Sequence, residues 1–265
     1  MSPVAIGIDI GGTGIKAAAV DLEAGELAGD RVRIPTPKPA TPDAVIETAA
    51  QTIAELPTDV PVGIGFPAAF VDGEVMESPN MDPAWLGLNA RDAFSERLGR
   101  PVTLLNDADA AGVAEVRFGA GKGVEGVILV LTLGTGIGSA LFTRGHLVPN
   151  TEIGHIELRG KDAELRAAAS VRERKDLSWK KWAGRLNEYL NAVDRLFWPD
   201  LIILGGGVSK KPERFMPHLD VRAPLEPARL ANHAGIVGAA FRAAYLAPAP
   251  GRRRRAPARS RRRSP

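Results

Sequence analysis

One short pattern occurs twice in this chain, and its two copies lie about half the sequence apart. Residues 8–20 read as a strand, the turn Gly-Gly-Thr-Gly and a second strand, and residues 128–142 read as a strand, the turn Gly-Thr-Gly-Ile-Gly and a second strand. Two strands across a short glycine turn form a hairpin. Ligands of α/β proteins bind at the carboxyl ends of strands. The repeat therefore predicts two similar lobes, each with a glycine hairpin that points into one cleft.

Strands and helices alternate along the rest of the chain, which indicates an α/β fold. Thr41-Pro42-Asp43 has the residues of a helix start. Apolar runs and helical spacing predict strands at 4–10, 15–20, 62–66, 102–105, 126–133 and 201–204, and helices from Pro42 onward and at 107–116, 179–196 and 234–246. We predict a small α/β lobe over residues 1–108, with the helix 234–246 packed back on it, and a large α/β lobe over residues 109–233.

Composition excludes several classes of protein. The chain has 265 residues and no cysteine, so disulfides, thiol catalysis and thiolate metal sites are excluded. No apolar run is long enough to span a membrane, and the N-terminus lacks the pattern of a secretory signal. We therefore expect a cytoplasmic protein with no membrane partner.

The charge is divided unevenly along the chain. Residues 248–265 carry eight arginines and no acid, which leaves 26 basic and 31 acidic side chains, a net charge of −5, in residues 1–247. The basic segment is typical of a disordered, solvated tail, and the alternative is an arm that binds polyanions without sequence specificity. We expect no specific nucleic-acid partner.

The first glycine turn has the residues of an anion site. Glycines let backbone N–H groups approach a phosphate closely, and Thr13 adds a hydroxyl donor. Asp9 could hold Mg²⁺, through water, because this ion keeps several of its waters. A plain hairpin turn is the alternative. The predicted phosphate-binding residues of this turn are Asp9, Gly11, Gly12, Thr13, Gly14 and Lys16.

Two further glycine motifs follow. Gly134, Thr135, Gly136 and Gly138 repeat the first turn. Gly205, Gly206 and Gly207 end a strand and are expected to open a helix, whose free N–H groups would attract a phosphate or a ribose. Any one of the three motifs could be structural, but three in this order favour a phosphate site.

In this order, the three motifs resemble the two phosphate motifs and the adenosine motif of the sugar-kinase, hexokinase and actin-like ATPase superfamily. Within it, residues 4–245 resemble the ROK family (repressor, ORF, kinase). Residues 8–16, 105–111 and 196–202 are similar to its actinobacterial polyphosphate glucokinase branch. The resemblance implies a two-lobed actin-like ATPase, ribonuclease H-like fold, Mg²⁺ as cofactor and a homodimer.

Asn106-Asp107 is the candidate catalytic motif. Phosphoryl transfer to a hydroxyl needs a base within hydrogen-bond reach, and Asp107 is our candidate. From the residues alone, an Asp after a strand is equally a helix N-cap. The resemblance implies that Asp107 is the catalytic base and that Asn106 holds a sugar hydroxyl.

Two other segments resemble sugar contacts of the family. Glu152 and His155 stand in a Glu-Xaa-Gly-His motif, and both side chains can bind hydroxyls. Asn80 and Asp82 match a further sugar contact, although Pro, Asn and Asp are also natural in a turn.

The chain departs from the family at one point. Many ROK proteins have a cysteine-rich zinc site after this histidine, and a chain without cysteine cannot form it. We expect no structural zinc, so other contacts must order residues 158–176. The acid of that segment that would replace the family's further sugar-binding Glu is left unassigned.

The resemblance implies a kinase that phosphorylates the 6-hydroxyl of glucose with inorganic polyphosphate, and it leaves ATP open as a second donor. One alternative is a strictly ATP-dependent ROK hexose kinase of other sugar specificity. Another is a non-catalytic ROK regulator, which needs a DNA-binding module that we do not expect because the first motif starts directly after Pro3. Lys210 and Lys211 are predicted to form a polyphosphate track, and ordinary solvated charges are the alternative.

Overall fold

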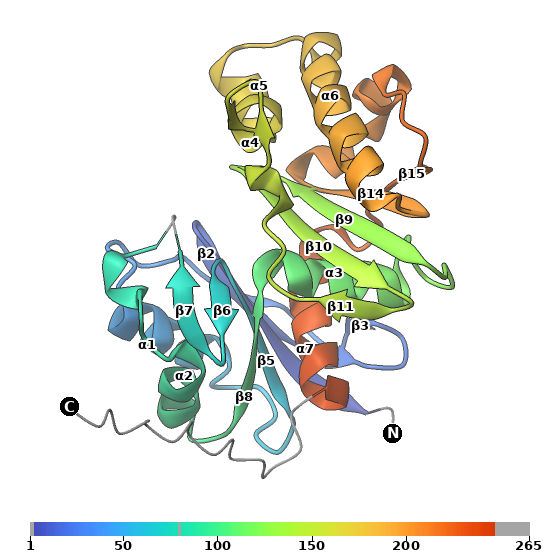
Figure 1. The fold of residues 1–265 in the computed structure, drawn as a ribbon. Coiled ribbons are helices and arrows are strands. Elements are labelled where there is room, and N and C mark those ends of the chain that lie inside the picture. Colours follow the sequence, from blue (N-terminus) through green and yellow to red (C-terminus); the bar gives the residue numbers. More distant parts are fainter. Residues whose placement is uncertain (1–2, 79–80, 247–265) are drawn as a thin grey trace, which may run out of the picture.

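The computed structural model describes residues 3–78 and 81–246, and most of its strands lie in two sheets (Figure 1). The first sheet has the order β3-β2-β1-β5-β8, and β4 also pairs with β2. The second has the order β11-β10-β9-β14-β15. The strands of the first are β1 (Val4–Gly11), β2 (Gly14–Asp21), β3 (Glu26–Leu27), β4 (Val32–Ile34), β5 (Val62–Phe66) and β8 (Val102–Asn106). Those of the second are β9 (Val127–Leu133), β10 (Ile137–Thr143), β11 (His146–Val148), β14 (Leu201–Gly206) and β15 (Leu225–Pro227).

The two sheets share one topology. Each contains an antiparallel hairpin, β1–β2 or β9–β10. On its other edge, the first strand of the hairpin pairs in parallel with a further strand, which pairs in parallel with the next: β1-β5-β8 in the first sheet and β9-β14-β15 in the second. The duplicated hairpin of the sequence is thus part of a larger structural repeat. Two small antiparallel pairs complete the strands: β6 (Ala69–Val71) with β7 (Glu74–Glu77), and β12 (Glu157–Leu158) with β13 (Lys161–Asp162).

The described helices include seven α-helices and six short 3₁₀ turns. The α-helices are α1 (Pro42–Thr52), α2 (Ala90–Leu98), α3 (Asp107–Phe118), α4 (Glu164–Ala167), α5 (Ala169–Arg174), α6 (Trp179–Phe197) and α7 (Ala234–Leu246). The 3₁₀ turns are η1 (Pro83–Trp85), η2 (Ile153–His155), η3 (Gly207–Lys210), η4 (Pro212–Arg214), η5 (Met216–His218) and η6 (Ala231–His233). None of these helices is long and apolar enough to cross a membrane.

Helices α3 and α7 pack against each other where the two sheets meet (Figure 1). Glycines allow this close packing, because a Cβ at Gly7 of β1 or Gly63 of β5 would collide with backbone carbonyls of α7. A Cβ at Gly238 of α7 would in turn collide with the carbonyl of Ala110 in α3. The backbone of α7 therefore rests directly on the first sheet and on α3.

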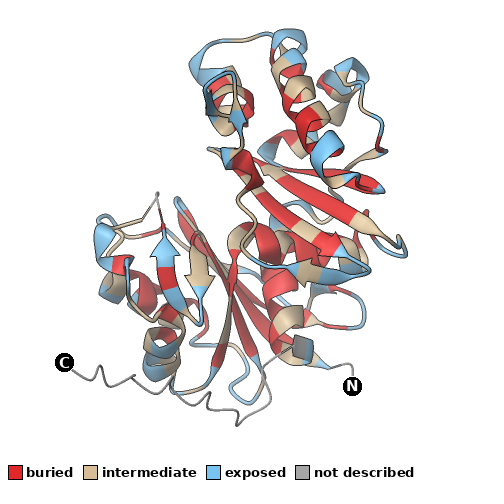
Figure 2. Cartoon of the chain, viewed as in Figure 1, coloured by how far each residue is buried: buried red, intermediate tan, exposed pale blue. Residues whose placement is uncertain are grey.

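Each sheet has its own apolar core (Figure 2). In the second lobe, α6 buries one stripe at helical spacing against the sheet, and its largest members are Trp182, Leu186, Tyr189 and Val193. In the first lobe, Phe66, Trp85 and Phe94 pack as an aromatic group beside α1 and α2. Burial of these faces is the main driving force for each half of the fold.

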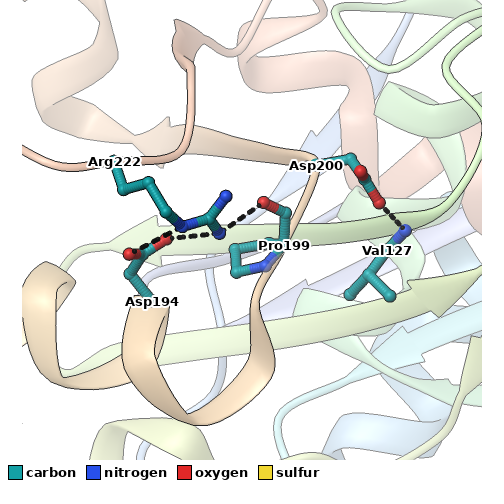
Figure 3. Close-up of polar contacts among 5 residues, drawn as sticks. All are labelled: Val127, Asp194, Pro199, Asp200 and Arg222. Carbon is teal, nitrogen blue, oxygen red and sulfur yellow. Dashed lines mark hydrogen bonds and ion pairs between the residues drawn. The ribbon is translucent and has the colours of Figure 1, made fainter.

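A charged cluster holds the junction of α6 and β14 (Figure 3). Arg222 donates to both carboxylate oxygens of Asp194, at 3.2 and 2.8 Å, and to the carbonyl of Pro199 at 3.0 Å. Asp200 accepts a 2.7 Å hydrogen bond from the backbone N–H of Val127 at the start of β9. These bonds set the start of β14 beside the start of β9.

The predicted helix after the triple glycine is wrong. The structure has only the four-residue turn η3 there, followed by η4. Pro212 cannot donate an intrahelical hydrogen bond and disfavours helical backbone at Lys211. Gly206 is the N-cap that precedes this turn, and its φ of 83° suits glycine. Asn80 and the Arg-rich segment 248–265 lie outside the described residues.

We predict that Arg222→Ala lowers the free energy of unfolding by about 1–3 kcal/mol, because it removes hydrogen bonds to a buried carboxylate. Arg229→Ala is the matched control, since its 3.7 Å ion pair with Glu226 is exposed and such pairs contribute about 0–1 kcal/mol. Urea unfolding of both variants measures the difference. Equal losses for the two variants would contradict the role given to Arg222.

Candidate active site

A cavity of about 590 Å³ lies between the glycine turns of the two sheets. It brings together residues from all three glycine motifs, the Asn-Asp motif and the Glu-Xaa-Gly-His motif. The predicted site residues that line it are Gly11, Gly12, Thr13, Asn106, Asp107, Gly134, Thr135, Gly136, Gly138, Glu152, His155 and Gly206. Segments that are distant in the sequence thus meet in one cleft, with glycine turns on two sides and carboxylates beside them.

Other predicted residues do not line this cavity in the described part of the chain. They are Asp9, Gly14, Lys16, Asp82, Gly205, Gly207, Lys210 and Lys211. Asp82 accepts a 2.9 Å hydrogen bond from Ala84 and caps η1. Lys210 and Lys211 are exposed beyond the triple glycine. A contact of these residues with substrate stays a prediction.

Asp9 and Lys16 form an ion pair directly behind the first glycine turn. They face each other across the β1–β2 hairpin, with 2.7 Å between Lys16 Nζ and Asp9 Oδ2. A Cβ at Gly235, in the first turn of α7, would lie 3.0 Å from the carboxylate of Asp9. The N-terminus of α7 and Nζ of Lys16 therefore both lie beside the carboxylate of Asp9.

This carboxylate is chemically suited to Mg²⁺. The described residues contain no group of three or more side chains that could hold a metal ion. Mg²⁺, however, commonly takes one or two protein carboxylates and completes its shell with water and substrate phosphates. Asp9 lies near enough to Asp107 for their charges to repel, so a cation between phosphate and these carboxylates would relieve that repulsion.

Asn106, and not Asp107, is the N-cap of α3. Its Oδ1 accepts hydrogen bonds from Ala108 at 2.8 Å and Asp109 at 3.2 Å, and its Nδ2 donates to the carbonyl of Ala68 at 3.2 Å. Asp107 is the first residue of the helix, and its Oδ1 accepts a 2.8 Å hydrogen bond from the adjacent N–H of Ala108. No other residue in the described part of the chain donates a hydrogen bond to Oδ2 of Asp107, and Asp107 lines the cavity.

The surroundings of Asp107 make it a stronger base than an ordinary aspartate. Burial, and then the negative charge of Asp9, raise the pKa of Asp107 to about 6. A carboxyl group with this pKa is largely ionised at neutral pH and still has appreciable proton affinity. That combination suits a general base.

Buried hydrogen bonds to β10 position Glu152. The hydroxyl of Ser139 bonds to the carbonyl of Thr151 and accepts from the N–H of Ile153 at 3.0 Å. Both neighbours of Glu152 are thus anchored, and its carboxylate lines the cavity. Burial raises the pKa of Glu152, and the nearby His155 partly offsets this effect.

His155 is oriented by an acid that the sequence did not single out. Its Nδ1 lies 3.0 Å from Oδ2 of Asp162. Because a carboxylate only accepts, Nδ1 carries the proton, and Nε2 is left for another partner. The hydrogen bond to Asp162 is also the main cause of the raised pKa of His155.

Glu164 is a second acid that the sequence did not assign. It lines the cavity, and its Oε2 accepts a 3.0 Å hydrogen bond from Ile137 in the second glycine hairpin. Four acids lie in residues 158–176, and the sequence offers no reason to choose among them. Only the placement of α4 over the cavity selects Glu164.

Ordinary contacts hold this segment in place. Arg159 and Arg166 pair with Glu188 of α6, at 2.5 and 3.2 Å. The indole of Trp182 donates to the carbonyls of residues 167 and 168, at 3.0 and 3.1 Å. Ser170 bonds to the backbone of the second glycine turn. These contacts attach residues 158–176 to α6 and to the second glycine turn.

Comparison with known proteins identifies the family. A sequence model described as the ROK family matches residues 5–166. The chain belongs to the ROK family. It is 50% identical over 236 residues to a polyphosphate glucokinase of Mycobacterium tuberculosis (strain CDC 1551 / Oshkosh), which is 89% of each chain.

Solved structures of ROK proteins superpose on the chain. Inorganic polyphosphate/ATP-glucomannokinase from Arthrobacter sp. strain KM has a TM-score of 0.88 and 50% identity, over 92% of this chain and 99% of that one. A ROK family glucokinase from Streptomyces griseus, in complex with glucose and AMPPNP, has a TM-score of 0.77 and 26% identity, over 91% of this chain and 99% of that one. The predicted actin-like ATPase fold of the hexokinase type is confirmed.

We predict that Asp162→Ala lowers the pKa of His155 toward its ordinary value of 6.5. A raised histidine pKa stabilises the folded state below the unfolded-state pKa, and this stabilisation is lost as the pH rises through the folded-state pKa. The wild type should therefore exceed the variant in thermal stability more at acidic pH than at alkaline pH.

NMR titration of the imidazole resonances measures the pKa directly, with His155→Gln to assign the signal. Glu213→Gln, which removes an exposed acid distant from the histidine in sequence, is the control. An unchanged His155 pKa in Asp162→Ala would contradict the pair.

Proposed function

We propose that this ROK-family protein is a kinase that transfers a phosphoryl group from inorganic polyphosphate to the 6-hydroxyl of glucose, with ATP as a second donor. The observation that carries the proposal is the cleft in which glycine turns from both lobes face Asp107, Glu152 and His155. The polyphosphate glucokinase of M. tuberculosis and the glucomannokinase of Arthrobacter, each 50% identical to the chain, support polyphosphate as the donor.

The donor phosphates would lie between the two glycine hairpins. Gly11, Gly12, Gly134 and Gly136 line the cleft, and glycines let backbone N–H groups approach a phosphate closely. Lys16 adds a positive charge behind the first turn. Mg²⁺, held at Asp9, would neutralise negative charge on the phosphates.

Asp107 would act as the general base. Its free carboxylate oxygen accepts the proton of the 6-hydroxyl as that oxygen bonds to the terminal phosphorus, and the bond from phosphorus to the rest of the donor breaks. The products are glucose 6-phosphate and a donor shorter by one phosphate. The elevated pKa of Asp107 suits it to take this proton near neutral pH.

The other carboxylates would hold the sugar. Glu152 and Glu164 are acceptors for hydroxyl donors, and Nε2 of His155, which is unprotonated when the ring is neutral, accepts one more. Asn106 uses its Oδ1 to cap α3, so its Nδ2 is the group that can contact a hydroxyl. We retain Asn80 and Asp82 as candidate sugar contacts.

Several wider predictions belong to the same proposal. Lobes 1–108 and 109–233 would close on the sugar and exclude water. A homodimer would cover apolar surface, and Leu196 and Trp198 at the end of α6, 64% and 66% exposed, are candidates for it. We also propose a cytoplasmic location. A strictly ATP-dependent ROK hexose kinase of other sugar specificity remains the second candidate, and the S. griseus glucokinase, solved with AMPPNP, supports ATP as a donor.

We predict that the wild type forms glucose 6-phosphate from glucose with either donor and that Asp107→Asn lowers kcat by about 10²–10⁴, the usual contribution of a general base. Glucose binding and the fold should persist. Because a raised aspartate pKa costs the folded state free energy at neutral pH, the variant should unfold at the same or a higher temperature.

Coupled assay of glucose 6-phosphate with each donor, together with calorimetry of glucose binding, measures these effects. No product from the wild type with polyphosphate would refute the proposed donor, and none with either donor would refute the kinase. Near-normal turnover in a folded Asp107→Asn protein would remove Asp107 as the base.

We predict that Lys210→Ala with Lys211→Ala raises KM for long polyphosphate more than KM for ATP. Both lysines are exposed just beyond Gly206, and a chain of phosphates that leaves the cleft needs a series of cations, each of which binds weakly. The difference should shrink in high salt. Equal effects on both donors, or none, would mean that these lysines form no polyphosphate track.

A further inference from the structure

Asp109 is a buried carboxylate that the mechanism above does not use. It lies two residues after Asp107 on α3 and is only 2% exposed. Its Oδ2 accepts a 2.9 Å hydrogen bond from the backbone N–H of Asn150, and its Oδ1 has no hydrogen-bond partner among the described residues. A buried carboxylate is costly unless it is paired, so its presence at this position calls for a reason.

Asn150, the partner of Asp109, connects the two halves of the molecule. Its side chain donates to the carbonyl of Phe70 at 2.9 Å and accepts from the N–H of Phe70 at 3.1 Å, which satisfies both backbone groups of that residue. Phe70 belongs to β6, which follows β5 of the first sheet, whereas Asn150 follows β11 of the second. Asn150 therefore acts as a clamp between the sheets.

The clamp is next to the sugar site on both sides. Asn150 is two residues before Glu152, and Phe70 directly follows Ala69, which lines the active-site cavity together with Glu152. The backbone of Asn150 has a φ of 56°, a left-handed conformation that a non-glycine residue adopts at a cost. The hydrogen bonds of Asp109 and Phe70 hold that conformation in place.

The surroundings of Asp109 couple it to both proposed site acids. Burial, the largest effect, raises the pKa of Asp109 to about 7, and the negative charges of Glu152 and Asp107 add to it. Arg242 of α7 attracts the carboxylate in the opposite sense. Asp109 thus interacts electrostatically with Glu152 and Asp107. It is not one of the described residues that line the cavity.

We propose that Asp109 is a positioning residue that, through the backbone of Asn150 and its clamp on Phe70, sets Glu152 and the 67–69 segment at the distance that glucose requires. This inference rests on the proposed function. Loss of the carboxylate releases Asn150, and Glu152 then moves away from the sugar. The donor site is built from the glycine turns and keeps its affinity.

The test compares Asp109→Ala, Asp109→Asn and Asn150→Gly in the full chain. Asp109→Ala should raise KM for glucose by about tenfold or more, because the N–H of Asn150 loses its buried acceptor, and KM for ATP should stay the same. Asp109→Asn retains an acceptor oxygen and should restore most of the glucose affinity. Asn150→Gly keeps the left-handed backbone and the N–H but removes the clamp, so it should also raise KM for glucose.

The double variant Asp109→Ala with Asn150→Gly should be no worse than the more impaired single variant, because both changes break one chain of contacts. Glu115→Gln is the matched control. Glu115 is 1% exposed on the same helix, and it accepts N–H groups from Ala120 at 3.0 Å and Leu230 at 2.8 Å, toward the other end of α3. This change should lower stability and leave KM for glucose unchanged.

Hydrogen exchange gives a readout that needs no activity. Asp109→Ala should speed amide exchange in residues 150–155, and Glu115→Gln should not. If the wild type fails to phosphorylate glucose but exchange changes as described, the proposed function fails and the positioning role stands. The role is overturned by unchanged exchange and glucose KM in Asp109→Ala, by an equal rise of glucose KM in Glu115→Gln, or by an Asn variant no better than Ala.

Discussion

The capping of α3 by Asn106 is the interaction on which the chemistry of the cleft depends. Four N–H groups at a helix start need acceptors, and Asn106 supplies one oxygen to two of them. If Asp107 had to do this work, its carboxylate would be turned into the helix and would have little proton affinity left. Because the neighbouring amide does it, Asp107 keeps one oxygen free, and burial beside Asp9 raises its pKa. The neutral cap and the proposed base are thus adjacent residues.

A second constraint acts on the segment that carries Asp162 and Glu164. Short strands and helices of this kind have little stability of their own. Here an ion pair to Glu188, the indole of Trp182 and the hydroxyl of Ser170 attach the segment to α6 and to the second glycine turn. As a result, Glu164 lines the cavity and Asp162 orients His155.

Much of this architecture could be predicted from the sequence because it depends on local signals. Glycine turns between apolar runs specify hairpins, and their repetition specified two related sheets. The motif Asn106-Asp107 predicts the point where a strand ends and a helix begins. Glu164 and Asp162 could not be chosen among their neighbours, because only tertiary packing brings Glu164 to the cavity and Asp162 to His155. The helix expected after Gly207 does not form, because Pro212 ends it after one short turn. The sequence could not predict whether Asn106 or Asp107 caps α3, because this depends on the side-chain conformations of the two residues.

The central claim is that Asp107 faces the hydroxyl that receives the phosphoryl group. A crystal structure of the full chain with glucose tests it most directly, because the sugar can be placed without any assumption about the donor. The account predicts the 6-hydroxyl oxygen of glucose within about 2.6–3.2 Å of the free carboxylate oxygen of Asp107, the reach of a general base, with the ring hydroxyls on Glu152, Glu164 and His155. Glucose bound in this cleft with its 6-hydroxyl turned away from Asp107, toward another acid, would contradict it.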